Sequence, residues 1–208
     1  MKTLLEKVNP FTKSPRVVEV EAGSSIQLGP PLFVIGAPRS GTTYINTVLN
    51  RHPKVFITNE LRFMLFYHEA VFGAAEKLAN ARAKDDFIEH FRSDIRRQVE
   101  RFFLTRVTKA SLKTRQKKPL IAQPGISDGS LWGDKNPFVG RAEYPGLIEL
   151  MDQVFPDALY VNIYRDPRNS ISSRMLRGKD TIENAAKDWR HIFEACRDLG
   201  RSVGPDRY

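Results

Sequence analysis

A short apolar run followed by a glycine-bounded loop is the part of this sequence best suited to hold an anion. Residues 33–35 are apolar, Gly36 and Gly41 bound the loop, and a helical pattern begins at Thr42. Backbone N–H groups at such a strand–loop–helix junction bind phosphate groups. The glycines have the G-x-x-x-x-G spacing of a nucleotide triphosphatase loop, but Thr42 stands where that motif has its lysine. The loop is therefore predicted to hold phosphate without this lysine.

The side chains of the loop favour a phosphate or sulfate ligand. Arg39 supplies a planar guanidinium that can bind two oxygens of either group. Ser40, Thr42 and Thr43 add hydroxyl donors on both sides of Gly41. A 5′-phosphosulfate fits this chemistry, and the alternative is a Gly-Thr turn that caps a core helix.

A second segment with anion-binding chemistry lies late in the chain. The β-rich run 157–164 ends in Arg165, and Pro167 then opens a helix. Ligands in open α/β sheets bind at the carboxyl ends of strands, where Arg165 is expected. Ser173, two helical turns later, could reach the same phosphate. By itself this segment is also typical of an exposed turn, but its pairing with the first loop favours a phosphate site.

These two segments resemble the donor-binding motifs of sulfotransferases that use 3′-phosphoadenosine 5′-phosphosulfate (PAPS). Residues 38–43, followed by Leu49 and the His-Pro pair at 52–53, are similar to the 5′-phosphosulfate loop of the tyrosylprotein and related carbohydrate or bacterial branches. Arg165 and Ser173 match the Arg-x7-Ser pair that binds the 3′-phosphate in this family. The resemblance implies a sulfotransferase that uses PAPS as co-substrate.

Two residues between the phosphate-binding segments carry the expected chemistry. Sulfuryl transfer needs a base for the acceptor's proton and a cation for the charge that develops on the leaving group. The resemblance to the tyrosylprotein branch assigns Glu60 as the base, Arg62 as a substrate-binding arginine beside it, and Lys135, in a Lys-x-Pro-Phe element, as the stabilising cation. Without the resemblance, Glu60 would be interpreted as an acid favoured at a helix N-terminus. Lys135 would be interpreted as a surface lysine before a turn.

The pattern of apolar and turn-forming residues predicts an α/β fold around these segments. Residues 1–31 are interpreted as a lead-in segment and 32–208 as a sulfotransferase-like domain. A helix over 42–50 and a strand over 55–58 would follow the first strand. The expected architecture is a P-loop-like three-layer fold, in which a parallel sheet is flanked by helices.

Between the two halves of the site, the sequence predicts a helical insertion and a loop. Apolar spacing indicates helices over 61–78 and 85–109, which we expect to lie over the site. Residues 113–130 contain prolines and glycines and are interpreted as a mobile loop and candidate substrate lid.

The last residues predict a helix over 181–199 that is capped by Gly200. Residues 201–208 resemble the lead into a further strand. Sulfotransferases continue beyond this point, so the resemblance implies a fragment, a short paralogue or a chain truncated at its C-terminus.

Composition fits one globular domain of 208 residues, with 41% hydrophobic and 27% charged residues. The first residues run into charge and no stretch approaches roughly 20 apolar residues, so we expect neither a signal peptide nor a membrane span. Cys196 is the only cysteine. A single cysteine allows no intramolecular disulfide and suits a cytoplasmic location.

The net charge of +9 is concentrated in residues 96–118. This segment is interpreted chiefly as the solvated face of an amphipathic helix, with Val99, Phe102 and Phe103 on its apolar side. Its alternative role is to bind an anionic acceptor, which could be a small molecule, glycan or peptide; nucleic acid is disfavoured. The histidines lack metal-ligand spacing, so no metal site is expected.

Two other functions stay open from the sequence. One is a P-loop nucleotide phosphotransferase, which the glycine spacing suggests and Thr42 disfavours. The other is a non-catalytic nucleotide-binding fragment. The acceptor's identity and the oligomeric state are not constrained by any motif.

Overall fold

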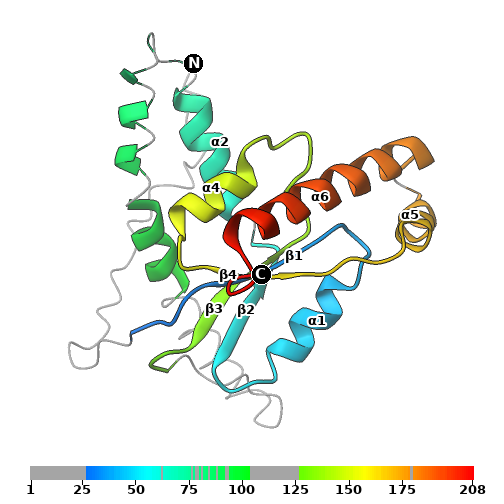
Figure 1. The fold of residues 1–208 in the computed structure, drawn as a ribbon, viewed down its shortest axis with the longest axis horizontal. Helices are drawn as coiled ribbons and strands as arrows, with labels where there is room; N and C mark the ends of the chain where they lie inside the picture. The colour runs from blue at the N-terminus through cyan, green and yellow to red at the C-terminus, as the bar shows by residue number, and fades with distance from the viewer. Residues whose placement is uncertain are drawn as a thin grey trace, which may run out of the picture.

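A four-stranded parallel sheet lies between two layers of helices (Figure 1). The computed structural model describes residues 27–61, 63–75, 77, 80, 82–83, 85–87, 89–91, 94–103, 127–178 and 180–208. The strands are β1 (Leu32–Ile35), β2 (Val55–Asn59), β3 (Leu131–Asn136) and β4 (Leu159–Asn162), in the order β2-β3-β1-β4. The helices are α1 (Thr42–Leu49), α2 (Phe63–Ala75), α4 (Leu147–Val154), α5 (Pro167–Met175) and α6 (Ile182–Val203). The predicted α/β architecture is confirmed.

Alternating residues of β1 divide the interior into two cores, because successive strand side chains point to opposite faces. Leu32 and Val34 belong to the core that includes the partly buried Ile45 and Leu49 of α1. Phe33 and Ile35 belong to the larger core, to which α2, α4 and α6 contribute. Figure 1 shows α1 on one side of the sheet and α4 with α6 on the other.

The polar strand β3 is an element that the apolar pattern does not predict. Its middle residues, Gly133, Asp134 and Lys135, are unusual for a buried strand, yet β3 pairs with both β2 and β1. A Cβ atom on Gly133 would lie 2.0 Å from the carbonyl oxygen of Leu32, so only glycine allows the two strands to approach this closely. Position within the sheet, and not local hydrophobicity, makes this segment a strand.

The helical region after β2 packs into the larger core. Met64 and Leu65 of α2 are buried there, as are Ile95 and Phe103 from the helical residues 94–103. The Phe103 ring lies 4.9 Å from that of Trp132, centroid to centroid. The predicted helical insertion therefore packs against one face of the sheet. Helix α2 is shorter than the helix predicted over 61–78.

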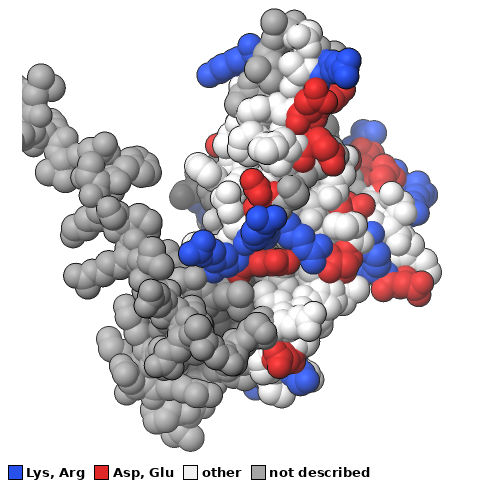
Figure 2. Space-filling model, turned by 90° about the vertical axis from the view of Figure 1, so that its left-hand side faces the viewer, with Lys and Arg blue, Asp and Glu red and all other residues white. Residues whose placement is uncertain are grey.

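Residues 96–103 are the described part of the basic segment, and their charges are largely matched by acids. Arg96 binds Asp157 through both terminal nitrogens, at 2.6 and 2.9 Å, and Glu100 through Nε at 2.9 Å. Phe102 is 37% exposed, so its predicted place on the apolar side is wrong, whereas Val99 and Phe103 are buried. Figure 2 shows basic and acidic side chains interspersed in a band across this side of the molecule. Residues 104–126, which contain the rest of the basic segment and most of the predicted lid, lie outside the described residues.

The last helix extends further than its sequence predicts. Thr181 is the N-cap and not the first helical residue, since its hydroxyl accepts a hydrogen bond from the N–H of Asn184, and α6 runs through Gly200 to Val203. A Cβ on Gly200 would lie 2.6 Å from the ring of Tyr208, so this glycine allows close packing and does not cap the helix. Residues 205–207 form a turn, and the carbonyl of Arg207 accepts a hydrogen bond from the N–H of Tyr160 at the edge of β4.

Candidate functional site

The strand register brings the predicted site residues to one edge of the sheet. Ile35 is paired with Asn136 on one side and Asn162 on the other, and Lys135 is paired with Asn59. The carboxyl ends of all four strands are therefore level. Loops that leave such an edge are where parallel α/β sheets bind ligands.

The loop between β1 and α1 has a backbone shaped for close approach. Gly36, Arg39 and Gly41 have φ values of 132°, 72° and 107°. A Cβ on Gly36 would lie 2.1 Å from the carbonyl oxygen of Ile163, which excludes any other residue at this position without rearrangement. Gly41 is the N-cap of α1 and offers no side-chain hydrogen bond, so the first-turn N–H groups stay available to an anion.

The hydroxyl groups of this loop differ in what they can offer a ligand. The Ser40 side chain is buried and donates its hydrogen bond to the carbonyl of Ala37 at 2.7 Å. This hydrogen bond stabilises the loop. The sequence suggested Ser40 as a hydroxyl donor to the ligand, but in this structure its proton is donated to Ala37. Thr42 is buried at the start of α1, whereas Thr43 is exposed.

Arg39 connects the two predicted phosphate-binding segments. Its Nε donates a hydrogen bond to Oγ of Ser173 at 3.1 Å, across 134 residues of sequence. Ser173 lies in α5, about two turns from the start of the helix at Pro167, as its spacing predicts. The exposed guanidinium of Arg39 therefore lies beside the helix that follows β4.

Arg165 lies in the connection between β4 and α5. The strand ends at Asn162 and not at Arg165, so the predicted strand end is wrong by three residues. The guanidinium of Arg165 is exposed, and no ion pair or hydrogen bond engages it within the described ranges. The adjacent Asp166 caps α5 and binds Arg168, whose guanidinium lowers the pKa of Asp166 to about 2. Asp166 is thus committed to Arg168, and the charge of Arg165 stays open to a ligand.

Glu60 and Lys135, the two residues assigned to the chemistry, form an ion pair. Oε1 of Glu60 contacts Nζ of Lys135, and the backbone N–H of Glu60 donates to the Lys135 carbonyl at 3.0 Å. The Lys135 side chain is 1% exposed and that of Glu60 is 34% exposed. Glu60 follows β2 with φ 55°, an uncommon conformation for a residue with a side chain, and it precedes α2 without belonging to it. The alternatives of a surface lysine and a helix-terminal acid therefore do not describe this pair.

Asp134 supports the segment that carries Glu60, a contribution that the sequence did not reveal. This buried carboxylate accepts hydrogen bonds from the Thr58 hydroxyl at 2.8 Å and from the N–H of Leu61 at 3.3 Å. Asp134 thus binds Thr58 and Leu61, and Lys135 binds Glu60 between them. The only signal in the sequence is the run of polar residues in Gly-Asp-Lys-Asn. Arg62 lies outside the described residues.

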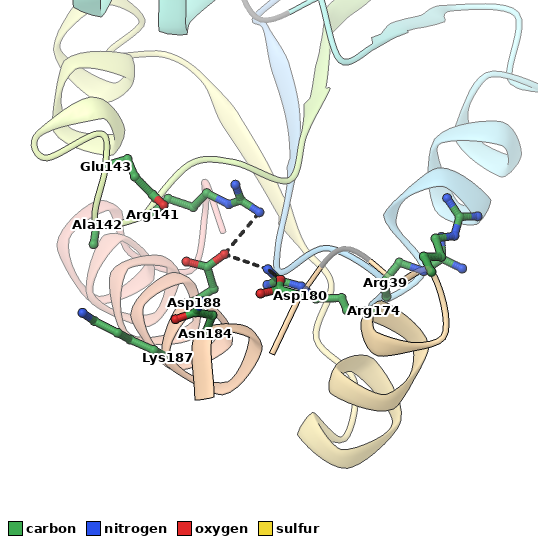
Figure 3. Close-up of a pocket in the computed structure, with 10 residues that line it drawn as sticks. Arg39, Arg141, Ala142, Glu143, Arg174, Asp180, Asn184, Lys187 and Asp188 are labelled. Atoms are coloured by element: carbon green, nitrogen blue, oxygen red, sulfur yellow. Dashed lines mark hydrogen bonds and ion pairs between the residues drawn. The ribbon is translucent and has the colours of Figure 1, made fainter. Parts of the chain in front are cut away.

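A polar pocket of about 710 Å³ opens beside Arg39 of the predicted phosphate loop, residues 36–41 (Figure 3). Arg141, from the loop after β3, binds Asp188 of α6 at 3.2 Å, and Arg174 of α5 binds the same carboxylate at 3.0 Å. Arg174 also contacts Asp180. This network ties the loop after β3 to α5 and α6, and no spacing in the sequence indicated it. The pocket is lined by Arg39, Arg141, Ala142, Glu143, Arg174, Arg177, Asp180, Asn184, Lys187 and Asp188.

The described ranges hold neither a metal-binding cluster nor a membrane-spanning helix. No group of three or more His, Cys, Asp or Glu side chains there is arranged to hold a metal ion. None of the described helices combines the length and apolar character needed to cross a membrane. His52 stabilises the loop after α1, where its Nδ1 accepts a hydrogen bond from the N–H of Lys54 at 3.2 Å.

Two solved structures share the fold of this chain. The sulfotransferase domain from the Synechococcus PCC 7002 olefin synthase matches with a TM-score of 0.53 and 22% identity, over 89% of this chain and 66% of that one. The sulfotransferase domain from the curacin biosynthetic pathway matches with a TM-score of 0.52 and 20% identity, over 87% of this chain and 66% of that one. The chain therefore spans slightly less than two thirds of either domain.

Sequence comparison extends this likeness from fold to family. No curated protein matches the sequence. The model of the sulfotransferase family, in contrast, matches residues 30–208, which include both predicted phosphate-binding segments and the Glu60–Lys135 pair. With this match over most of its length, the chain belongs to the sulfotransferase family.

Proposed function

We propose that this chain transfers a sulfuryl group from PAPS to a hydroxyl or amine acceptor. The observation that carries the proposal is the Arg39–Ser173 hydrogen bond, since it joins two segments that each have anion-binding chemistry. Arg39 and the first-turn N–H groups of α1 would hold the 5′-phosphosulfate. Arg165 and Ser173 would hold the 3′-phosphate, with Arg165 supplying a charge that no carboxylate among the described residues neutralises.

Glu60 and Lys135 would act on the two bonds that change during transfer, Glu60 at the acceptor and Lys135 at the leaving group. Transfer breaks the S–O bond to the donor's 5′-phosphate and forms an S–O bond to an acceptor hydroxyl, or an S–N bond to an acceptor amine. Glu60 takes the acceptor's proton, and the Lys135 ammonium stabilises the charge that develops on the leaving oxygen. The direct contact between them supports a concerted role, because loss of the Glu60 charge on protonation would release the ammonium toward the leaving group.

Calorimetric titration tests the donor class before any acceptor is known. The wild-type chain is titrated with 3′,5′-bisphosphoadenosine and with ADP, without magnesium, and so is Arg165→Ala. We expect binding that requires the 3′-phosphate and weakens by about 1.5–3 kcal/mol when the charged hydrogen bonds of Arg165 are lost. Arg168→Ala is the matched control, because this exposed neighbour is already bound to Asp166.

Two results would contradict the proposal. Magnesium-dependent binding of ADP in preference to 3′,5′-bisphosphoadenosine would favour the phosphotransferase alternative. Folded protein that binds neither nucleotide would show that this chain lacks the donor site.

A further inference from the structure

The proposed donor site does not account for the pocket beside Arg39. Its volume of about 710 Å³ lies in the range of small-molecule sites. We propose that it binds the acceptor and selects a small hydroxyl compound that carries a carboxylate, sulfate or phosphate group. The acceptor role rests on the proposed sulfotransferase function, whereas the anion selectivity rests on the pocket's own side chains.

Cations exceed carboxylates in the lining of this pocket. Asp188 is already bound by Arg141 and Arg174, and Asp180 by Arg174. The lining as a whole has five cations and three carboxylates, of which Glu143 is the third. No carboxylate in the described part of the chain pairs with Arg177 or Lys187, the two cations that remain once Arg39 holds the donor. Such a surplus attracts an anionic ligand and disfavours a cationic one.

The ion network itself lacks hydrogen-bond acceptors. Nε of Arg141 and Nη1 of Arg174 are buried and have no partner among the described residues. A buried donor without an acceptor is unfavourable, so native structures rarely keep one. Arg141 and Arg174 both line the pocket, so the oxygens of an anion bound there could supply the acceptors that these N–H groups lack. An oxyanion is therefore the class of ligand that would complete the hydrogen bonds of this network.

The arrangement of the lining also gives the ligand a direction. Figure 3 shows Arg39 at one end of the pocket and Ala142, Asn184 and Lys187 toward the other. Arg39 belongs to the phosphate loop, where the sulfuryl group would be transferred. An anionic group bound near Lys187 and Arg141 leaves the rest of the acceptor to extend toward Arg39. The charge would then orient the hydroxyl toward the reaction.

Residue-resolved NMR titration with inorganic phosphate tests the inference. The full chain is first saturated with 3′,5′-bisphosphoadenosine, so that the phosphate loops are filled. We expect saturable shifts at the backbone amides of Asn184 and Lys187 and at the Nε–H of Arg141. Lys187→Glu should raise the dissociation constant at least ~10-fold, as expected when a charged hydrogen bond becomes a repulsion.

Arg190→Glu provides the matched control on the same helix, because its side chain is 75% exposed and lies outside the pocket lining. It should leave the phosphate affinity unchanged. Shifts confined to residues 36–43, or equal affinity in Lys187→Glu and wild type, would overturn the anion site. If bisphosphoadenosine does not bind while phosphate still shifts the pocket residues, the sulfotransferase proposal fails and the acceptor role fails with it, but the anion site stands.

Discussion

The cations at the carboxyl edge of the sheet are held in two different ways. Lys135 is almost fully buried and pairs with Glu60, whereas Arg39 and Arg165 are exposed and have no carboxylate partner in the ranges that the structure describes. A buried charge requires a counter-charge, while an exposed guanidinium is stabilised by water until a ligand replaces it. The arginines are thus available to an anion, whereas Lys135 is held in a fixed position beside Glu60, as the role in transfer that we propose for it requires.

This difference predicts that substitutions of the exposed arginines and of the buried ion pair affect different steps. Loss of an exposed arginine should weaken nucleotide binding. Loss of the buried ion pair should slow transfer and leave binding nearly intact, because an interaction made mainly in the transition state affects the rate and not the affinity.

The largest effect is expected from Lys135→Met, which keeps the length of the side chain and removes its charge. Sulfuryl transfer should slow by ~10²–10³-fold, the usual loss for one group that stabilises developing charge. Single-turnover formation of 3′,5′-bisphosphoadenosine gives the rate, and calorimetry gives the nucleotide affinity. A loss of affinity as large as the loss of rate would place Lys135 with the binding arginines.

Gly36→Ala should come next, through the shape of the phosphate loop. The new Cβ would lie 2.1 Å from the Ile163 carbonyl at a φ of 132°, so we expect the free energy of unfolding to fall by about 2–4 kcal/mol. Gly146→Ala is the control, because its φ is also positive but no atom lies within 4 Å of the added carbon. Denaturant unfolding should show a smaller loss there, of about 1–2 kcal/mol from the left-handed conformation alone. Equal losses of unfolding free energy in the two variants would mean that the loop adjusts to the added Cβ without an energetic penalty.

Arg39→Ala and Ser173→Ala compare the two partners of the hydrogen bond between the phosphate segments. Removing the arginine should weaken binding of 3′,5′-bisphosphoadenosine by about 1.5–3 kcal/mol, and removing the neutral hydroxyl by about 0.5–1.5 kcal/mol. The same calorimetric titration measures both. If Ser173→Ala cost more than Arg39→Ala, the hydroxyl and not the guanidinium would be the main contact.

The smallest effect is expected far from the site, at Asp157. The guanidinium of Arg96 lowers the pKa of Asp157 below its ordinary value of 3.8. Its contribution to stability is therefore present above pH 3.8 and lost as the pH falls through the lower, folded-state pKa. Asp157→Asn should cost about 0.5–1 kcal/mol at pH 7, since both side chains are partly exposed, and the difference from wild type should vanish in acid. Thermal unfolding from pH 7 to pH 2 measures it, and a difference that stays constant with pH would exclude the ion pair as its cause.

Local sequence patterns were sufficient to predict the elements whose signals come from adjacent residues. The helix start at Thr42, the helix that begins near Thr181 and the proline that opens α5 follow from the conformational preferences of a few adjacent residues. The residue types of the phosphate loop likewise indicated an anion site, because glycine spacing and a central arginine are local features.

Which of these residues come into contact could not be predicted from local patterns, because it depends on the three-dimensional fold. The hydrogen bond between Arg39 and Ser173 and the burial of Lys135 depend on the order of strands in the sheet, which no local pattern encodes. The same holds for the polar strand β3, whose residues are buried because β1 and β2 flank it. The ion network around Asp188 could not be predicted for the same reason, since its members come from the loop after β3, from α5 and from the segment that begins just before α6. Local propensity is set by neighbours in the chain, whereas a site is set by neighbours in space.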